Sequence, residues 1–398
     1  MFKDPIEVTS DTSCHFFEDQ LLVFSQKNQG IYELNQSAGM IWLMCEKRMS
    51  LDEVAQELSS SYGIDYETAR TDTSALLEQW AALGLIAADK DALCEPSNDA
   101  ESSHPENIAF GAERHTELEP VKTFGIRFAA HDYVFRFGSG HLADLIIPMF
   151  AHIGSDADRA EFGIDVLEDG DQILIVSDGK VLDAFKDQSE TSSRLTFQLV
   201  VMAYAKMDFL IAVHSASLSL GNGCVMFPGV CGVGKTTLAA GLLKAGFIHY
   251  TDDTAIVDRK THKVIPTPVS LRIKEGSFGI VEKMFPGSLL TAVHYSSDGR
   301  KIRYLPPSVG RFVSEPSSGE TVKALVFNRY EPDSDTRIER IPRVDAFRRI
   351  QECGYYMEGG LDRARVSELL DWIRGIDCYE LTISSLDQAI PVIREIAE

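Results

Sequence analysis

The stretch that decides the fold is "FPGVCGVGKTTLAAGLL", residues 227–243. Gly229, Gly234, Lys235 and Thr236 have the G-x-x-x-x-G-K-[ST] spacing of a phosphate-binding loop. Glycines let backbone amides point at oxygen anions, where side chains would block them. Lys235 can bridge terminal phosphates, the Thr236 hydroxyl can bind Mg²⁺, and the following helix adds the positive end of its dipole. The spacing therefore predicts a nucleoside triphosphate site.

The neighbouring sequence supports this interpretation. "CVMFPG" before the loop is typical of a buried strand, and a helical pattern follows at once. A glycine-rich turn without a ligand is the alternative, and the strand–loop–helix order favours the phosphate site. We expect ATP with Mg²⁺, held by Gly229, Val230, Cys231, Gly232, Val233, Gly234, Lys235, Thr236 and Thr237.

Two adjacent carboxylates follow the next predicted strand, "FIHYTDD". At the end of that strand, Asp252 and Asp253 would lie at the edge of the sheet where open α/β folds bind ligands. One could hold Mg²⁺ while the other accepts a proton from an attacking hydroxyl. A solvated turn is the alternative, and the nearby phosphate loop favours a catalytic role.

A histidine, His214, lies in the apolar segment "FLIAVHSASL", which predicts a strand beside the loop strand. Spacing alone favours a hydrogen-bonded core residue here. The whole order "VHSASLSLGNGCVMFPGVCGVGKTTLAAGLLKAGFIHYTDD", however, resembles the catalytic core of the HPr serine kinase/phosphorylase family over residues 209–271. That family has a strand histidine, the loop and a paired-aspartate strand end in this order.

The resemblance implies roles for several residues. His214 would lie near the γ-phosphate, Lys235 and Thr236 would bind phosphate and Mg²⁺, and Asp252 or Asp253 would act as the base. Thr236 and Asp253 are the expected metal ligands. The family's HPr-recognition segment has no counterpart in this sequence, so HPr is not the expected substrate. Because HPr kinases form hexamers, a homo-oligomer is possible here too.

Two basic residues follow the aspartates in "VSLRIKEGSFGI". Its loose alignment with the family makes Arg272 and Lys274 candidate phosphate contacts. Basic residues on a strand are more often solvated, which is the competing interpretation.

The chain divides into three parts on composition. Residues 91–120 lie in an acidic stretch with three prolines and no apolar period, which predicts a flexible linker. Residues 1–90 precede it and residues 121–398 follow. The larger part alternates strand and helix patterns, so we expect an α/β P-loop kinase domain of the HPr kinase type.

The first ninety residues predict a small winged-helix-like α+β domain. "LLVFSQKNQGIYELN" predicts two strands around a polar turn, and three helical patterns follow. Ser50 and Glu53 have the spacing of a capping box, and Gly84 would end the helix that starts near Tyr66.

This domain resembles the PqqD family, whose members recognise leader peptides of ribosomally made, modified peptides. The matching positions within residues 15–87 are Tyr32, Leu34, Asn35, Ala38, Ile41, Trp42, Glu53, Leu58, Tyr62, Asp72, Leu76, Leu77, Leu83, Gly84 and Leu85. The resemblance implies that a leader peptide adds as a strand to an exposed sheet edge. That edge would be "LLVFS" or "GIYELN", beside the helix of residues 66–83.

Composition excludes several partners. A net charge of −22 argues against nucleic acid or an anionic membrane as a general partner. It also argues against a DNA-binding winged helix, because the first domain is itself acidic. The N-terminus lacks a secretion signal, and no run is apolar enough to span a membrane. Seven cysteines without a C-x-x-C pair favour a cytoplasmic protein.

These observations predict a peptide-directed serine/threonine kinase, a phosphotransferase with an alcohol acceptor. The first domain would capture a precursor peptide and the second would phosphorylate one of its hydroxyls. Two alternatives stay open. The chain could be an ATP-hydrolysing switch that delivers a peptide to another enzyme, or a small-molecule kinase with a scaffold domain at its front.

Overall fold

The computed structural model describes residues 2–88, 119–296, 299–357 and 359–398. The chain forms two compact units, Met1–His104 with Glu358–Asp371, and Pro105–Met357 with Trp372–Glu398. The linker expected at residues 91–120 lies almost wholly outside the described residues. The larger domain was expected to span residues 121–398, but residues 358–371 within this range belong to the N-terminal unit, because they make their contacts there.

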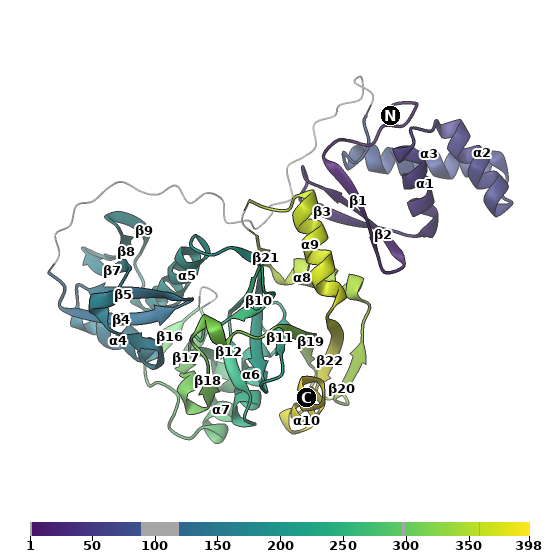
Figure 1. Cartoon of the computed structure of the whole chain (residues 1–398). Helices are drawn as coiled ribbons and strands as arrows, with labels where there is room; N and C mark the ends of the chain where they lie inside the picture. Colours follow the sequence, from purple (N-terminus) through teal and green to yellow (C-terminus); the bar gives the residue numbers. More distant parts are fainter. Residues whose placement is uncertain (1, 89–118, 297–298, 358) are drawn as a thin grey trace. The chain divides into compact units, whose positions relative to one another are not determined.

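The N-terminal unit is a three-stranded antiparallel sheet with helices (Figure 1). Its strand order is β1-β2-β3, and every neighbouring pair is antiparallel. The elements are β1 (Thr12–Phe17), β2 (Gln20–Ser25), β3 (Gly30–Leu34), α1 (Gln36–Glu46), α2 (Leu51–Tyr62), α3 (Tyr66–Ala82) and the first part of α9 (Arg363–Arg374).

Local signals in the sequence fix these helices. The Ser50–Glu53 capping box that starts α2 is present, and the backbone at Gly84 takes the left-handed conformation just after α3. Trp42 and Trp80 meet edge to face in the core under the sheet, with ring centroids 5.2 Å apart. The expected strands and helices are therefore confirmed, and β1 is an additional strand.

The expectation that "LLVFS" could be an exposed edge is wrong. This segment lies in β2, which has β1 on one side and β3 on the other. β3, the "GIYEL" segment, is an edge of the sheet. β1 is the other edge, so a peptide that extends this sheet pairs with an edge strand, β1 or β3, rather than with β2.

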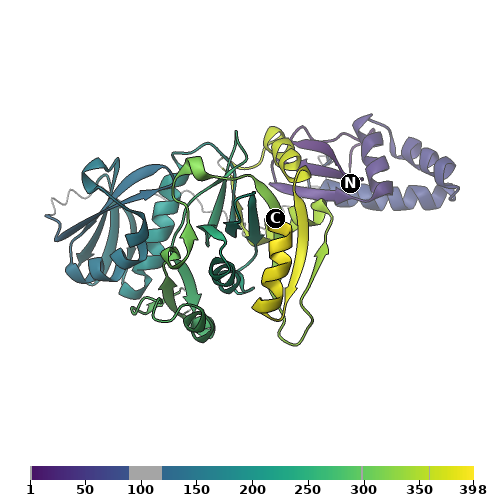
Figure 2. The same ribbon diagram turned by 60° about the horizontal axis from the view of Figure 1, so that its bottom comes forward.

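The C-terminal unit is mixed α/β, with a large central sheet (Figures 1 and 2). The main path runs β14-β13-β10-β11-β19-β22-β20, and β12, β18 and β21 pair beside it. The strands are β10 (Phe209–Ser219), β11 (Cys224–Pro228), β12 (Ile248–Thr251), β13 (Thr254–Asp258), β14 (Val264–Ile265), β18 (Arg311–Phe312), β19 (Val322–Tyr330), β20 (Arg337–Arg340), β21 (Tyr355–Tyr356) and β22 (Asp377–Ile383).

Parallel pairing within this sheet places the site. β11, β19 and β22 are parallel neighbours, so the loops after their carboxyl ends meet at one edge. Helices α6 (Lys235–Lys244) and α10 (Leu386–Ala397) follow β11 and β22, and their apolar faces share one core with the sheet. The α/β expectation is therefore confirmed at the level of a mixed sheet with flanking helices.

Two smaller sheets complete this unit. A six-stranded sheet, β6-β4-β5-β7-β8-β9, packs with α4 and α5, and the strands of a three-stranded sheet, β15-β17-β16, come before and after α7 in the chain. Their bounds are β4 (Lys122–Phe128), β5 (His131–Phe137), α4 (Gly140–Phe150), β6 (Gly154–Ser155), β7 (Phe162–Asp169), β8 (Gln172–Ser177), β9 (Lys180–Phe185), α5 (Thr191–Tyr204), β15 (Leu271–Lys274), α7 (Phe278–Met284), β16 (His294–Tyr295) and β17 (Lys301–Leu305). The remaining helix is α8 (Arg343–Cys353). Over the described residues, no helix combines the length and apolar character that crossing a membrane requires.

Candidate phosphate-binding site

The glycine-rich segment of residues 229–237, called the phosphate loop below for its sequence pattern, runs from the end of β11 into the first turn of α6, as the sequence predicts. Gly232 and Gly234 have φ angles of 101° and 93°, in the region that favours glycine. Gly234 directly precedes α6, so the loop passes into the amino end of a ten-residue helix. A loop of this shape next to a helix N-terminus suits an anion.

Lys235 is folded back onto this loop. Its ammonium group donates to the carbonyl oxygen of Gly229 and, at 3.1 Å, to that of Val230. The side chain is buried, and burial lowers its pKa. A buried ammonium held by neutral carbonyl oxygens is poorly compensated, so phosphate oxygens would be better partners.

Side chains from distant segments hold the loop in place. The Asn328 amide, on β19, donates to the Val233 carbonyl at 2.9 Å. The Thr237 hydroxyl lies 2.7 Å from that of Ser277, just before α7. No sequence pattern points to Asn328 or Ser277, because each is far from its partner in the chain and only folding brings the two together.

Asp252 is the most buried acid at the site. It follows β12, and its residue is 6% exposed. Its Oδ2 accepts from the Arg272 backbone N–H at 3.4 Å, whereas its Oδ1 has no hydrogen-bond partner among the described residues. Burial raises its pKa to about 7, against the opposing effects of the Thr236 hydroxyl and the Lys235 charge. An orphaned, buried carboxylate oxygen beside a threonine hydroxyl suits a hard cation.

Asp253 lies beside His214. The His214 Nδ1 is 2.9 Å from the Asp253 carbonyl oxygen and 3.9 Å from its carboxylate Oδ1. Burial lowers the pKa of His214, which favours the neutral imidazole, although the Asp253 charge acts in the opposite direction. His214 also joins the loop directly, since its carbonyl accepts from the Gly229 N–H at 3.3 Å.

The two basic residues after the aspartates also lie at the site. The Arg272 guanidinium donates to the Ser193 hydroxyl at 3.2 Å, and its charge acts on both aspartates. The Lys274 ammonium is 2.6 Å from the Cys231 sulfur in the phosphate loop. Both side chains thus contact protein groups at the site and are not only solvated. Their role as phosphate contacts remains a prediction.

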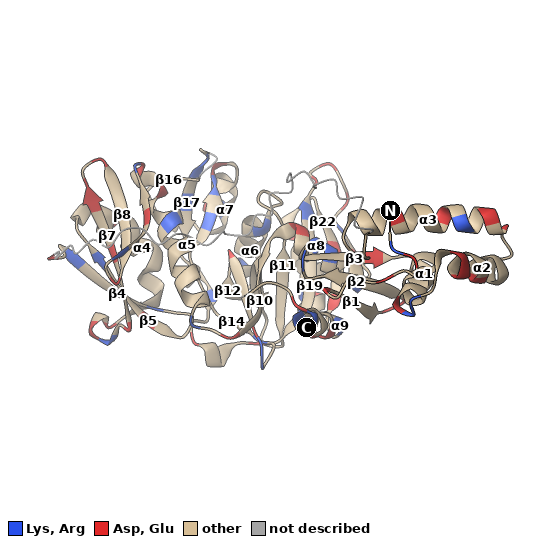
Figure 3. Cartoon of the chain, turned by 90° about the horizontal axis from the view of Figure 1, so that it is seen from above, with Lys and Arg blue, Asp and Glu red and all other residues tan. Residues whose placement is uncertain are grey.

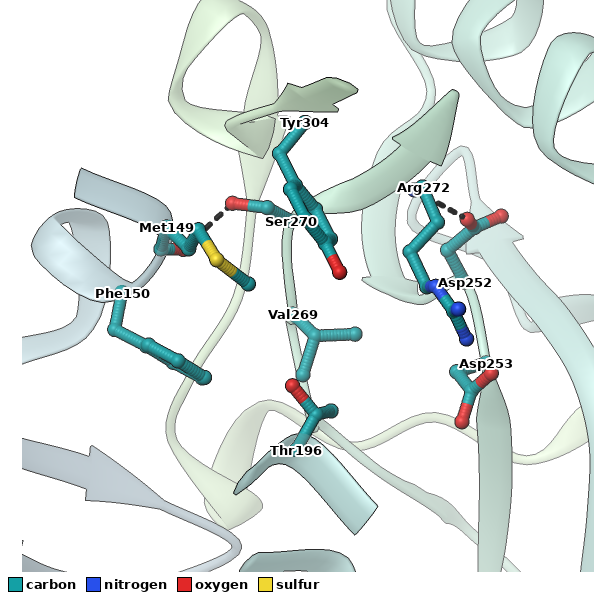
Figure 4. A pocket seen from close by; sticks show the side chains of 9 residues that line it. All are labelled: Met149, Phe150, Thr196, Asp252, Asp253, Val269, Ser270, Arg272 and Tyr304. Carbon is teal, nitrogen blue, oxygen red and sulfur yellow. Dashed lines mark hydrogen bonds between the residues drawn. The ribbon is translucent and has the colours of Figure 1, made fainter. Parts of the chain in front are cut away.

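A small cavity opens beside the carboxylates (Figure 4). Figure 4 shows Arg272, Asp252 and Asp253 on one side of it, with Tyr304 and Val269 facing them. The remaining lining residues are Met149, Phe150, Thr196 and Ser270. The volume of this cavity is about 10 Å³, enough for about one water molecule. The two carboxylates and Arg272 thus face hydroxyl and apolar groups across a nearly filled space.

A second, larger cavity borders the phosphate loop itself. Its volume is about 760 Å³, within the range of small-molecule sites. Gly232, Val233 and Gly234 border it, as do side chains of α7 and α10. Its apolar lining includes Ile280, Met284, Tyr330, Leu386 and Ile390. Tyr330 at the end of β19 and Ile383 at the end of β22 border it, as expected for the ligand-binding edge of this sheet.

The residues therefore fit ATP and Mg²⁺. The loop can surround an anion with backbone N–H groups, and the Lys235 ammonium is held by carbonyl oxygens of the loop. Thr236 and Asp252 place two oxygen-bearing side chains next to each other. The expected metal pair was Thr236 with Asp253, whereas the structure places the Thr236 hydroxyl beside Asp252. Across the described ranges, no group of three His, Cys, Asp or Glu side chains forms a further metal site.

The N-terminal unit presents its own candidate surface at the edge strand β3, which contacts α1. Figure 3 marks in red several acidic residues along the ribbons of α2 and α3. Those of α3 include Glu67, Asp72 and Glu78, and those of α2 include Asp52 and Glu53. This charge suits a basic peptide better than a polyanion.

Comparison with known proteins assigns the N-terminal part. Residues 20–86 match the family model described as Coenzyme PQQ synthesis protein D (PqqD). A solved structure titled "TbiB1 in Complex with the TbiA(beta) Leader Peptide" is similar, at 18% identity and a TM-score of 0.20, covering 21% of this chain and 99% of that chain. No curated protein matches the chain. The expected PqqD-like domain is therefore confirmed.

Proposed function

We propose that this protein is an ATP-dependent kinase that phosphorylates a hydroxyl of a peptide captured by its PqqD domain. The observation that carries the proposal is the convergence of Lys235, Asp252, Asp253 and His214 on one glycine-rich loop. The PqqD match at residues 20–86 supports peptide recognition by the same chain.

The peptide would bind by β-augmentation. β3 is an edge strand, so its outward backbone groups can pair with an extended chain. A peptide held there stays tethered near the kinase and reaches a high effective concentration, which relaxes the sequence requirement at the acceptor hydroxyl. A precursor peptide with a leader segment fits this arrangement.

The nucleotide would extend along the loop. The phosphates would lie on the loop amides and Lys235, and the base and ribose would occupy the 760 Å³ cavity beside Tyr330 and Ile280. The γ-phosphate end would then lie toward Asp252 and Asp253, which border the small cavity of Figure 4.

The transfer is an in-line displacement at the γ-phosphorus. The acceptor hydroxyl oxygen forms a bond to phosphorus, the bond to the β–γ bridging oxygen breaks, and ADP leaves. One aspartate would accept the hydroxyl proton. The other, with Thr236, would hold Mg²⁺, which would supply positive charge against the phosphates. Arg272 and His214 line the path of the transferred group.

A transfer assay tests the proposal. The full-length protein is incubated with Mg²⁺, γ-labelled ATP and the short peptides encoded beside its gene, each with and without its leader segment. We expect label on the hydroxyl of a leader-bearing peptide, at least tenfold slower labelling without the leader, and none with Lys235→Ala. Label that appears only as free phosphate would instead establish the switch hypothesis.

The small-molecule alternative needs a separate control. Excision of residues 1–92 would also uncover the part of α9 that packs in the N-terminal unit. Removal of the leader from the peptide leaves the enzyme whole and is therefore the better experiment. Equal labelling of small hydroxyl compounds and leader-bearing peptides would favour the scaffold hypothesis.

A further inference from the structure

The sheet of the N-terminal unit is buried on both faces. Leu21 and Val23 of β2 belong to the core under helices α1 to α3. Side chains alternate along a strand, so Leu22 and Phe24 point to the opposite face. Both are only 1% exposed. Three helices on one face cannot bury them, and a second layer must cover the other.

The first part of α9 lies on this second face (Figure 1). At one end, the Gln29 side chain pairs with the Leu361 backbone: its Oε1 accepts from the N–H at 2.6 Å and its Nε2 donates to the carbonyl at 3.0 Å. Farther along, the Ser367 hydroxyl lies 3.4 Å from Nδ1 of His15 on β1. The segment thus reaches from the start of β3 to the middle of β1.

The sequence of α9 fits this position. Val366, Leu369 and Leu370 are 0%, 2% and 3% exposed, and their i, i+3, i+4 spacing makes one apolar stripe. Ala364 and Glu368, on either side of Val366, are exposed. An amphipathic helix of this kind forms where its apolar stripe is covered.

Just before α9, the backbone at Gly360 passes close to the Gln29 side chain. A Cβ at this position would lie 2.7 Å from the Gln29 Oε1, and its φ angle is 72°. A side chain would therefore push the Gln29 amide away from Leu361 and would also strain the backbone. The chain enters α9 through a turn suited to the Gln29 contact.

We propose that residues 361–371 are the fourth helix of the peptide-recognition domain, which is therefore assembled from two distant parts of the chain. The occupant of the second sheet face is this segment of the same chain, docked through Leu361, Val366, Leu369 and Leu370. The family match ends at residue 86 and does not include it.

Hydrogen–deuterium exchange on the full-length protein tests this without nucleotide or peptide. Val366→Asp places a charge on the buried stripe, and Ala364→Asp places the same charge on the exposed side of the same helix. With Val366→Asp we expect the amides of β1 and β2 to exchange at least tenfold faster, with β11, β19 and β22 unchanged. Ala364→Asp should match the wild type.

A second variant guards against general unfolding. Gln29→Ala removes the two hydrogen bonds to Leu361, and should speed exchange at residues 361–366 severalfold with all of the central sheet unchanged. Wild-type exchange in β1 and β2 of Val366→Asp would overturn the proposal. So would exchange that rises equally throughout the chain in both Asp variants. The measurement is independent of kinase activity, so its failure and that of the proposed function are distinguishable.

Discussion

Gln29 and Leu361, 332 positions apart in sequence, are joined by a pair of hydrogen bonds between the side-chain amide of one and the backbone N–H and carbonyl of the other. Backbone pairing of this kind does not depend on the side chain at position 361, so it leaves no local pattern. It shows that the recognition domain at the front of the chain is completed by a segment near its end.

Replacement of Lys235 tests the phosphate site. Lys235→Ala should weaken ATP binding at least a hundredfold and abolish transfer, because the loop loses the buried cation that would meet the terminal phosphates. Thermal stability should be unchanged or higher, since the buried ammonium is poorly compensated without nucleotide. Calorimetric titration with MgATP and a thermal melt measure both quantities.

Lys260→Ala is the matched control for Lys235. Lys260 is exposed in the turn after β13, so its loss should leave transfer within twofold of the wild type. If the Lys235→Ala protein still transferred phosphate at the normal rate, the loop would have no part in the mechanism.

The two aspartates can be told apart by their metal dependence. Asp252→Asn and Asp253→Asn should each slow transfer by about a thousandfold, within the scale of general-base and electrostatic effects. The variant that lost the metal ligand should need at least tenfold more Mg²⁺ for ATP binding. The other should bind MgATP normally. Full activity in both variants would show that neither carboxylate takes part.

The cavity lined by α7 and α10 should hold the nucleoside. Ile280 is 46% exposed and borders this cavity, so Ile280→Asp alters its wall without disturbing the core. We expect ATP affinity to fall at least tenfold and the affinity for inorganic triphosphate to stay constant. Val293→Asp, at another exposed apolar position outside the cavity, is the control. Equal losses for both ligands would place the nucleoside elsewhere.

Acid should destabilise the protein through buried histidines. His249 is fully buried, and burial lowers its pKa from 6.5 to about 3. Between these values the unfolded chain binds a proton that the folded chain does not. Stability is therefore complete above about pH 6.5 and is lost as the pH falls toward 3. The contribution is up to about 5 kcal/mol, at roughly 1.4 kcal/mol for each pKa unit.

A non-titrating side chain checks the histidine effect. His249→Gln should flatten the pH dependence of the free energy of unfolding between about pH 6.5 and 4.5, as measured by urea titration. His262→Gln, at an exposed position, should retain the wild-type slope. A slope that is identical in all three proteins would assign the acid sensitivity to other groups.

Much of the site could be predicted from sequence because its elements are local. The phosphate loop needs glycines, Lys235 and Thr236 at fixed spacing, and the backbone around them follows from that chemistry. The capping box at Ser50 and Glu53 is equally local, and it begins α2 as predicted. Asp252 and Asp253 could be located because they follow the predicted strand after the loop helix, and the end of such a strand lies close to the loop.

The sequence by itself determined the glycine-rich loop between β11 and α6, the helices and strands around it and the PqqD-like domain, since each depends on residues close together in the chain. Only the tertiary structure decided which aspartate lies beside Thr236, that Asn328 supports the loop, and that β2 is covered on both faces. These contacts join residues tens to hundreds of positions apart. Their partners are chosen by burial and backbone pairing, which leave no spacing pattern in the sequence.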